Sequence, residues 1–187
     1  MRLWIPVLLI TSASGTLFAQ DAEFSLSGGR SQISSKDLGS GYSLADGFSL
    51  GFRLTLNSTR YFGHEVGYSY NRSHLLLQGV DTGGMAIHQG GYNFLGYATK
   101  EGKRIRPFAT GGVHFSNFVQ PGSSASQGGG NTKFGINYGA GVKVRLTTRF
   151  AVRADYRQYV TGKPFDLPGA SGKLKQNVIS LGLAFVL

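Results

Sequence analysis

The chain has 187 residues, no cysteine, 29 glycines, 12% aromatic residues and a formal net charge of +10, with only 15% charged residues. One domain fits this length, and the absence of cysteine excludes a fold held by disulfides. Lys and Arg are spread along the whole chain instead of forming one basic stripe, which argues against a nucleic-acid-binding protein. A basic surface suits contact with anionic lipid headgroups better.

The first 19 residues have the three parts of a secretory signal peptide. Arg2 is the basic start, residues 3–10 are apolar, and small and polar residues lead to a predicted cleavage site after Ala19. The apolar stretch is shorter than the roughly 20 residues that a transmembrane helix needs, so such a helix is the weaker alternative. We predict a signal peptide at 1–19 and one exported domain at 20–187.

After the signal peptide, segments in which every second residue is apolar recur to the end of the chain. This period of two predicts β-strands. In the last segment, Ile179, Leu181, Leu183 and Phe185 share one face. Each segment is long enough to cross a bilayer as a tilted strand, which takes about 9–11 residues. We predict strands at residues 22–34, 46–57, 60–73, 85–98, 104–118, 132–147, 149–162 and 174–187.

The connections between these strands alternate between short and long. Three are tight, at residues 57–60, 100–103 and 147–148. A membrane barrel has this asymmetry, with short periplasmic turns and longer extracellular loops. The pattern therefore predicts an all-β fold, an eight-stranded antiparallel up-and-down transmembrane β-barrel. The long connections lie at residues 35–45, 74–84, 119–131 and 163–173.

The two faces of the predicted strands differ in size as well as in polarity. Between Phe134 and Leu146, large apolar residues alternate with glycines and polar residues. Small residues suit the crowded lumen of a narrow barrel, whereas a soluble ligand-binding barrel, the alternative, would expose the apolar band to water. Aromatic residues near the strand ends are expected to form girdles at the membrane interfaces. They are Tyr61, Phe62, Tyr68, Tyr70, Tyr92, Phe94, Tyr97, Phe115, Phe118, Phe150, Tyr156 and Tyr159.

Three stretches of the chain resemble the eight-stranded outer-membrane barrels, such as the membrane domain of outer-membrane protein A. They are residues 106–113 (RPFATGGV), residues 137–157 and the final strand. In the final strand, Gly182, Phe185 and Leu187 are similar to the C-terminal signal that the barrel-assembly machinery reads, although that signal usually ends in an aromatic residue. The resemblance implies a bacterial outer-membrane location. It also implies periplasmic chaperones, the barrel-assembly machinery and outer-membrane lipid or lipopolysaccharide as partners.

Charged residues occupy the inward phase of several predicted strands. A lone charge in a narrow lumen has a large desolvation penalty, so these charges are expected to pair. We predict that Glu65 and Asp155 pair with inward arginines and fill the interior, with a conducting or gated channel as the alternative. The predicted lumen network comprises Arg53, Glu65, Lys143, Arg145, Arg153, Asp155 and Arg157, with Arg104 and Arg106 on the same phase.

One short string suggests an enzyme. The His-x-Ser-Asn string that starts at His114 is similar to that of the outer-membrane lipid A deacylases, in which a His activates a Ser. No Asp or Glu lies between Glu101 and Asp155 to complete a triad, and His114 and Ser116 fall on the inward phase, away from lipid. A lipid A acyl hydrolase using these two residues is therefore the alternative. We predict a non-enzymatic monomer with a structural, envelope or surface-interaction role through its extracellular loops, and with no metal, cofactor or nucleic acid.

Overall fold

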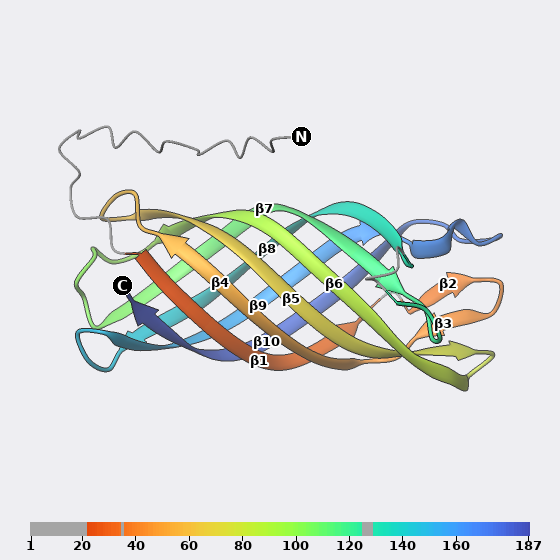
Figure 1. Cartoon of the computed structure of the whole chain (residues 1–187). Coiled ribbons are helices and arrows are strands. Elements are labelled where there is room, and N and C mark those ends of the chain that lie inside the picture. Colours follow the sequence, from red (N-terminus) through yellow and green to blue (C-terminus); the bar gives the residue numbers. More distant parts are fainter. Residues whose placement is uncertain (1–21, 35, 125–128) are drawn as a thin grey trace, which may run out of the picture.

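The computed structural model describes residues 22–34, 36–124 and 129–187, so the predicted signal peptide lies outside the described residues. One antiparallel sheet closes on itself into a barrel (Figure 1). Among the described residues, no helix is long and apolar enough to cross a bilayer. The predicted eight-stranded fold is confirmed. The wall consists of β1 (Ala22–Ile33), β4 (Gly47–Leu56), β5 (Phe62–Leu77), β6 (Val80–Tyr97), β7 (Ile105–Val119), β8 (Asn131–Arg145), β9 (Phe150–Gly162) and β10 (Lys173–Val186).

The strands of the wall pair in chain order, and β10 pairs with β1 to close the barrel. The register shows how far the strands are staggered. A path of paired residues that leaves β1 at Glu23 and runs once around the wall returns to β1 at Ile33, ten residues further on (33 minus 23). Such a shear tilts the strands of a barrel by about 35–45° from its axis.

The outer wall is apolar and the inner wall is polar. Leu181 and Leu183 of β10 are 62% and 61% exposed, and Phe134 of β8 is 80% exposed. Their neighbours on the opposite phase, such as Ser180, are buried inside the barrel. A continuous exposed apolar band of this kind suits lipid and is unsuited to water, which excludes the soluble-barrel alternative.

The two ends of the barrel are built differently. The connections 57–61, 98–104 and 146–149 lie at the same end as the start of β1 and the end of β10 (Figure 1). Short turns mark this end as periplasmic. The opposite end carries a small hairpin, β2 (Asp37–Gly39) and β3 (Tyr42–Leu44), and a single 3₁₀ turn, η2 (Pro164–Asp166). The hairpin extends the sheet, because β3 pairs with the outer end of β5.

The prediction of a long loop at residues 74–84 is wrong. Strands β5 and β6 continue through these residues and meet at a two-residue turn formed by Gln78 and Gly79. Both turn residues have positive φ, +50° and +83°, which is the type I′ conformation favoured in two-residue hairpins. The leucines and the valine that flank this turn (75–77 and Val80) sustain the strands.

Most of the predicted girdle aromatics lie on the outer wall, but three do not. Tyr97 and Phe118 are 5% and 1% exposed, and Tyr159 lines an interior cavity. Strand alternation explains the difference, because an aromatic residue near a strand end faces lipid only when it falls on the outward phase.

Candidate functional site

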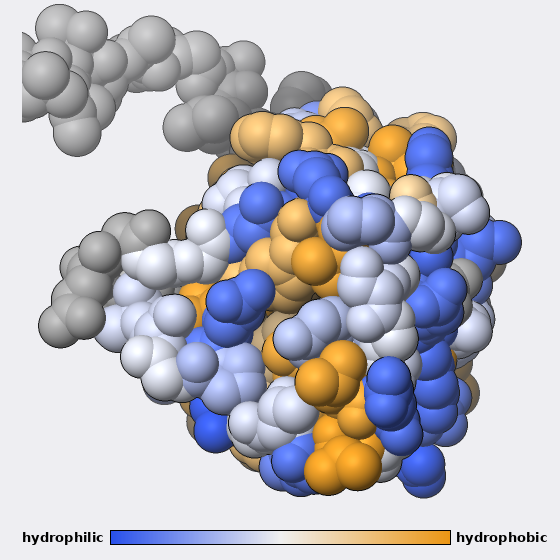
Figure 2. Space-filling model, turned by 90° about the vertical axis from the view of Figure 1, so that its right-hand side faces the viewer, coloured by the Kyte–Doolittle hydropathy of each residue, from blue (hydrophilic) through white to orange (hydrophobic). Residues whose placement is uncertain are grey.

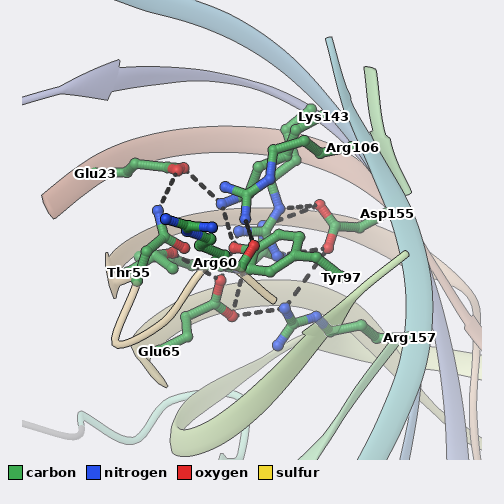
Figure 3. A network of polar contacts seen from close by, with 12 residues as sticks. Glu23, Thr55, Arg60, Glu65, Tyr97, Arg106, Lys143, Asp155 and Arg157 are labelled. Carbon is green, nitrogen blue, oxygen red and sulfur yellow. Dashed lines mark hydrogen bonds and ion pairs between the residues drawn. The ribbon is translucent and has the colours of Figure 1, made fainter. Parts of the chain in front are cut away.

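The barrel interior is filled by three layers of side chains, and the periplasmic layer is charged (Figure 3). Lys143 of β8 donates to Glu23 of β1 at 2.5 Å and to the Tyr97 hydroxyl at 2.9 Å. Glu23 also accepts a hydrogen bond from Asn57 at 3.0 Å. The Arg106 guanidinium stacks over the Tyr97 ring, 3.7 Å from its centre. These contacts close the periplasmic mouth.

Deeper in the same charged layer lies a group of three arginines and two carboxylates. Arg153 binds both oxygens of Asp155, at 2.7 and 2.8 Å, and donates to Glu65 at 2.5 Å. Arg157 donates to Glu65 at 2.6 Å, and Arg53 lies 3.5 Å from Asp155. All five residues are at most 7% exposed, and Glu65 is fully buried. Forked, charge-assisted hydrogen bonds of this kind offset the cost of burying the charges.

The middle layer of the lumen is polar but uncharged. Gln89 of β6 donates to the Ser116 hydroxyl at 2.9 Å and to Gln176 at 3.0 Å, and Gln176 donates to Ser31 at 2.7 Å. Asn71 donates to Gln89 at 2.8 Å. This chain of amides and hydroxyls crosses the barrel from β5 and β6 to β10 and β1, so it bridges the interior above the charged layer.

The outer layer is an apolar cap that the sequence analysis did not anticipate. Its residues come from seven strands, five of the wall and the two of the hairpin, and are at most 7% exposed. Figure 2 looks onto this end and shows hydrophobic groups between hydrophilic ones. A hollow of about 310 Å³ lies against the cap, bordered by Tyr42, Phe165 and Leu167 among others. The buried members of the cap are Ile33, Leu38, Leu44, Leu75, Met85, Ile87, Phe118 and Leu174.

Two of the residues that were predicted to face the lumen are not buried in it, and both lie at the periplasmic mouth. Arg145 lies there half-buried. The prediction of an inward Arg104 is wrong, because β7 begins only at Ile105 and Arg104 is an exposed turn residue. The remaining predicted residues are buried inside the barrel, together with two that were missed, Glu23 and Tyr97. The alternation that places Phe24 and Leu26 on the outside already indicated an inward Glu23.

The two residues of the enzymatic alternative lie inside the barrel. Ser116 is 0% exposed and His114 is 4% exposed. The Ser116 hydroxyl accepts its hydrogen bond from Gln89, and within the described residues neither ring nitrogen of His114 has a hydrogen-bond partner. The arrangement therefore provides neither an activated hydroxyl nor access for a lipid acyl chain.

The predicted assembly-signal residues lie along the last strand. Phe185 faces outward, with its ring centre 5.3 Å from that of Phe150. Gly182 lies in the wall where a Cβ would come 2.4 Å from the Leu26 carbonyl oxygen of β1. Leu187 follows the strand and donates its backbone N–H to Ala22. All three positions border the seam at which β10 closes the barrel against β1.

Comparison with known families decides the identity of the fold. The sequence matches the family model of the outer membrane protein beta-barrel domain over residues 5–186. The protein belongs to this family. No curated protein matches the chain. The family and its structural neighbours place this outer-membrane barrel in the bacterial outer membrane.

Solved structures show the same fold. Neisserial surface protein A has a TM-score of 0.63 at 13% identity and covers 90% of this chain and 97% of its own. The N-terminal barrel domain of Pseudomonas aeruginosa OprF has a TM-score of 0.54 at 16% identity, covering 90% and 98%. Ail of Yersinia pestis, solved in complex with the heparin analogue sucrose octasulfate, has a TM-score of 0.52 at 16% identity, covering 90% and 99%.

Proposed function

We propose that this protein is a closed, non-enzymatic barrel whose working surface is its extracellular end, where it binds anionic saccharides. The observation that carries the proposal is the filling of the lumen by a charged layer, a polar layer and an apolar cap. A lumen filled by side chains offers no route for a solute, so an activity has to reside on the outer surface.

The lipid A hydrolase alternative has weaker support. His114 and Ser116 lie buried among lumen side chains, while an acyl chain would approach from the lipid side of the wall. On the outer wall, His64 and His88 pair with the phenol hydroxyls of Tyr92 and Tyr68, at 2.6 and 2.5 Å, and not with a serine. A binding role for the loops therefore explains the molecule better than catalysis does.

The charges at the outer end favour an anionic partner. Lys173 and Lys175 project from β10 and are exposed, next to the end of the apolar band at Ile179. Phosphate and sulfate groups on saccharides attract such side chains. Within the described residues, the basic side chains of this end are Arg30, Lys36, Arg72, Lys133, Lys163, Lys173 and Lys175, against the acidic Asp37, Asp46, Asp81 and Asp166.

Two sources offer this chemistry, the phosphorylated lipopolysaccharide around the barrel and sulfated polysaccharides outside the cell. Ail, which shares the fold, was solved with the heparin analogue sucrose octasulfate, so sulfated polysaccharide has its own arm in the test. Both sources are anionic sugars, so one surface serves for either, and an experiment with separate arms distinguishes them.

The test measures binding of the purified barrel in detergent to lipopolysaccharide and, separately, to heparin, at low and high salt. K173E/K175E should weaken binding by about tenfold, and salt should weaken binding to the unaltered protein. A matched charge reversal at the periplasmic end, K103E/R149E, should leave affinity unchanged. If K173E/K175E weakens binding to just one of the two ligands, that ligand represents the natural source of the anionic saccharide. No binding in either arm, or equal loss in the control, would contradict the proposal.

A further inference from the structure

A small cavity lies inside the barrel between the charged layer and the polar layer. Its volume is about 20 Å³, enough for one or two water-sized particles. Arg53, Arg157, His114, Asn137 and Tyr159 are among the residues that border it. Strands β4 to β9 all contribute to its lining, so the cavity is separate from the exposed lysines of the extracellular end.

Several buried polar atoms around this cavity have no hydrogen-bond partner within the described part of the chain. They include the Nε of Arg157, both side-chain polar atoms of Asn137 and both ring nitrogens of His114. The three side chains are only 2%, 2% and 4% exposed. A buried polar atom without a partner costs about 1–3 kcal/mol, so such a cluster indicates a bound species.

The charge of the interior favours an anion. The described lumen holds five buried basic side chains against three buried carboxylates. At the periplasmic mouth, Lys143 pairs with Glu23, and Arg106 stacks on Tyr97 and donates to the Arg60 carbonyl oxygen. The exposed Lys103 and Arg104 lie beside this group. The remaining excess lies deep in the barrel. The buried basic residues are Arg53, Arg106, Lys143, Arg153 and Arg157, and the carboxylates are Glu23, Glu65 and Asp155.

In the deep group, three arginines face only Glu65 and Asp155. One positive charge is therefore uncompensated there. Arg53 has only long contacts with the two carboxylates, at 3.9 and 3.5 Å, and the Nε of Arg157 has no partner in the described part of the chain. Both arginines border the cavity. An uncompensated charge in a low-dielectric interior has a large desolvation cost. A counter-ion in the cavity removes that cost.

We propose that the cavity binds a monatomic anion, chloride under physiological conditions. Arg157 Nε–H and the Asn137 side-chain amide donate to the ion, and an N–H of the His114 ring is the third donor. The volume excludes phosphate and larger oxyanions. The ion acts as a structural element that neutralises the arginine group, and it is independent of saccharide binding at the outer end.

Bromide replaces chloride and is visible by anomalous scattering. The full barrel is folded and crystallised in sodium bromide without chloride. An anomalous peak in the cavity, within hydrogen-bond reach of Arg157 Nε and Asn137 Nδ2, is expected. Cavity density without anomalous signal at high bromide means that water alone occupies the site, and it would overturn the proposal.

The replacement Asn137→Asp supplies the missing negative charge with almost no change in shape. Unaltered protein should unfold about 3–6 °C higher in chloride, at ten times the dissociation constant, than in gluconate at equal ionic strength. N137D should lose this difference and the bromide peak. The control N71D, at an amide buried equally deeply but bonded to Gln89, should keep the chloride effect. A chloride effect that persists in N137D would contradict the assignment. If N137D does not fold, the bromide peak of the unaltered protein decides.

Discussion

Arg153 and Glu65 connect opposite walls of the barrel. Their side chains meet at 2.5 Å, and their strands, β9 and β5, are four strands apart in either direction around the closed sheet. Thr55 supports the carboxylate with a hydrogen bond of 3.2 Å, and the Phe108 ring lies under the guanidinium. The pair acts as a brace across the diameter, so the wall and the contents of the lumen stabilise each other.

Replacing Glu65 with Gln should destabilise the barrel strongly. The amide cannot neutralise Arg153 and Arg157, and removing one partner of a buried ion pair costs about 3–5 kcal/mol. The measurement is the temperature at which the folded, fast-migrating form is lost on a denaturing gel, which should fall well below that of the unaltered barrel.

The control for this prediction is Asp166→Asn at the outer end. Asp166 also pairs with a basic residue, Lys133, but its side chain is 77% exposed, so the change should cost less than about 1 kcal/mol. Equal effects of E65Q and D166N, or a double variant E65A/D155A as stable as the unaltered protein, would mean that the charged layer does not support the barrel.

Glycines in the wall provide a second prediction. A Cβ at Gly139 would lie 2.0 Å from the Tyr156 carbonyl oxygen of the neighbouring strand, whereas one at Gly28 would lie 3.5 Å from a Leu50 methyl group. G139A should therefore cost about 1–3 kcal/mol, and G28A should be neutral. Unfolding by denaturant in detergent measures both, and a neutral G139A would show that the strands separate more easily than this geometry implies.

A third prediction concerns lipid A. The alanine variants H114A and S116A, made separately, should leave the mass spectrum of cellular lipid A identical to that of cells with the unaltered barrel. S116A should lower stability by about 0.5–1.5 kcal/mol, because the Gln89 amide loses its acceptor. Appearance of a lipid A species with one acyl chain fewer, only when both residues are intact, would establish the hydrolase instead.

A fourth prediction concerns acid at the outer end. The backbone N–H of Ile33, which donates to Asp46 at 3.0 Å, and the nearby Lys36 hold the pKa of the Asp46 carboxyl below its ordinary value of 3.8. A lowered folded-state pKa means that the stabilisation is complete above the ordinary pKa and disappears as pH falls through the lower one. Solvent screens this carboxylate, so the contribution is below about 1 kcal/mol.

The measurement is the difference in unfolding midpoint between the unaltered protein and D46N as a function of pH. The difference should be constant above pH 4 and should vanish at lower pH. A difference that is already absent at neutral pH would show that Asp46 does not hold the base of the β2–β3 hairpin.

The strands of the barrel wall were predictable because the pattern that indicates each strand lies within its own short segment of sequence. Alternation in β10, from Ile179 to Phe185, depends only on the strand itself. Contacts between residues far apart in the sequence were harder to predict. The contact of Glu65 with Arg153 spans 88 positions and depends on the shear of the whole sheet. The charges alone predicted that Glu65 and Asp155 pair with inward arginines. Which arginine pairs with which carboxylate could be known only from the strand register. The glycines were predicted to fit a crowded lumen, whereas a side chain at Gly139 would collide mainly with the backbone of the neighbouring strand.

The outer end departed furthest from the sequence-based expectations. Residues 35–45 and 74–84 were predicted as loops, but the first segment contains the β2–β3 hairpin and the second continues β5 and β6. Leu38 and Leu44 became cap residues because the hairpin folds over the lumen, a tertiary arrangement that alternation within a short segment does not reveal. Glycines and serines around these segments indicated loops by composition alone.

The central claim is that this outer-membrane barrel is closed by its own side chains. Single-channel recording in a planar lipid bilayer tests it most directly, with the folded state of the inserted protein verified by its heat-modifiable mobility. We expect no current steps above the bare bilayer from the unaltered protein at moderate voltage. Regular, reproducible current steps from fully folded protein would contradict the account, because they would require an open path through the arginine group around Glu65 and through the apolar cap.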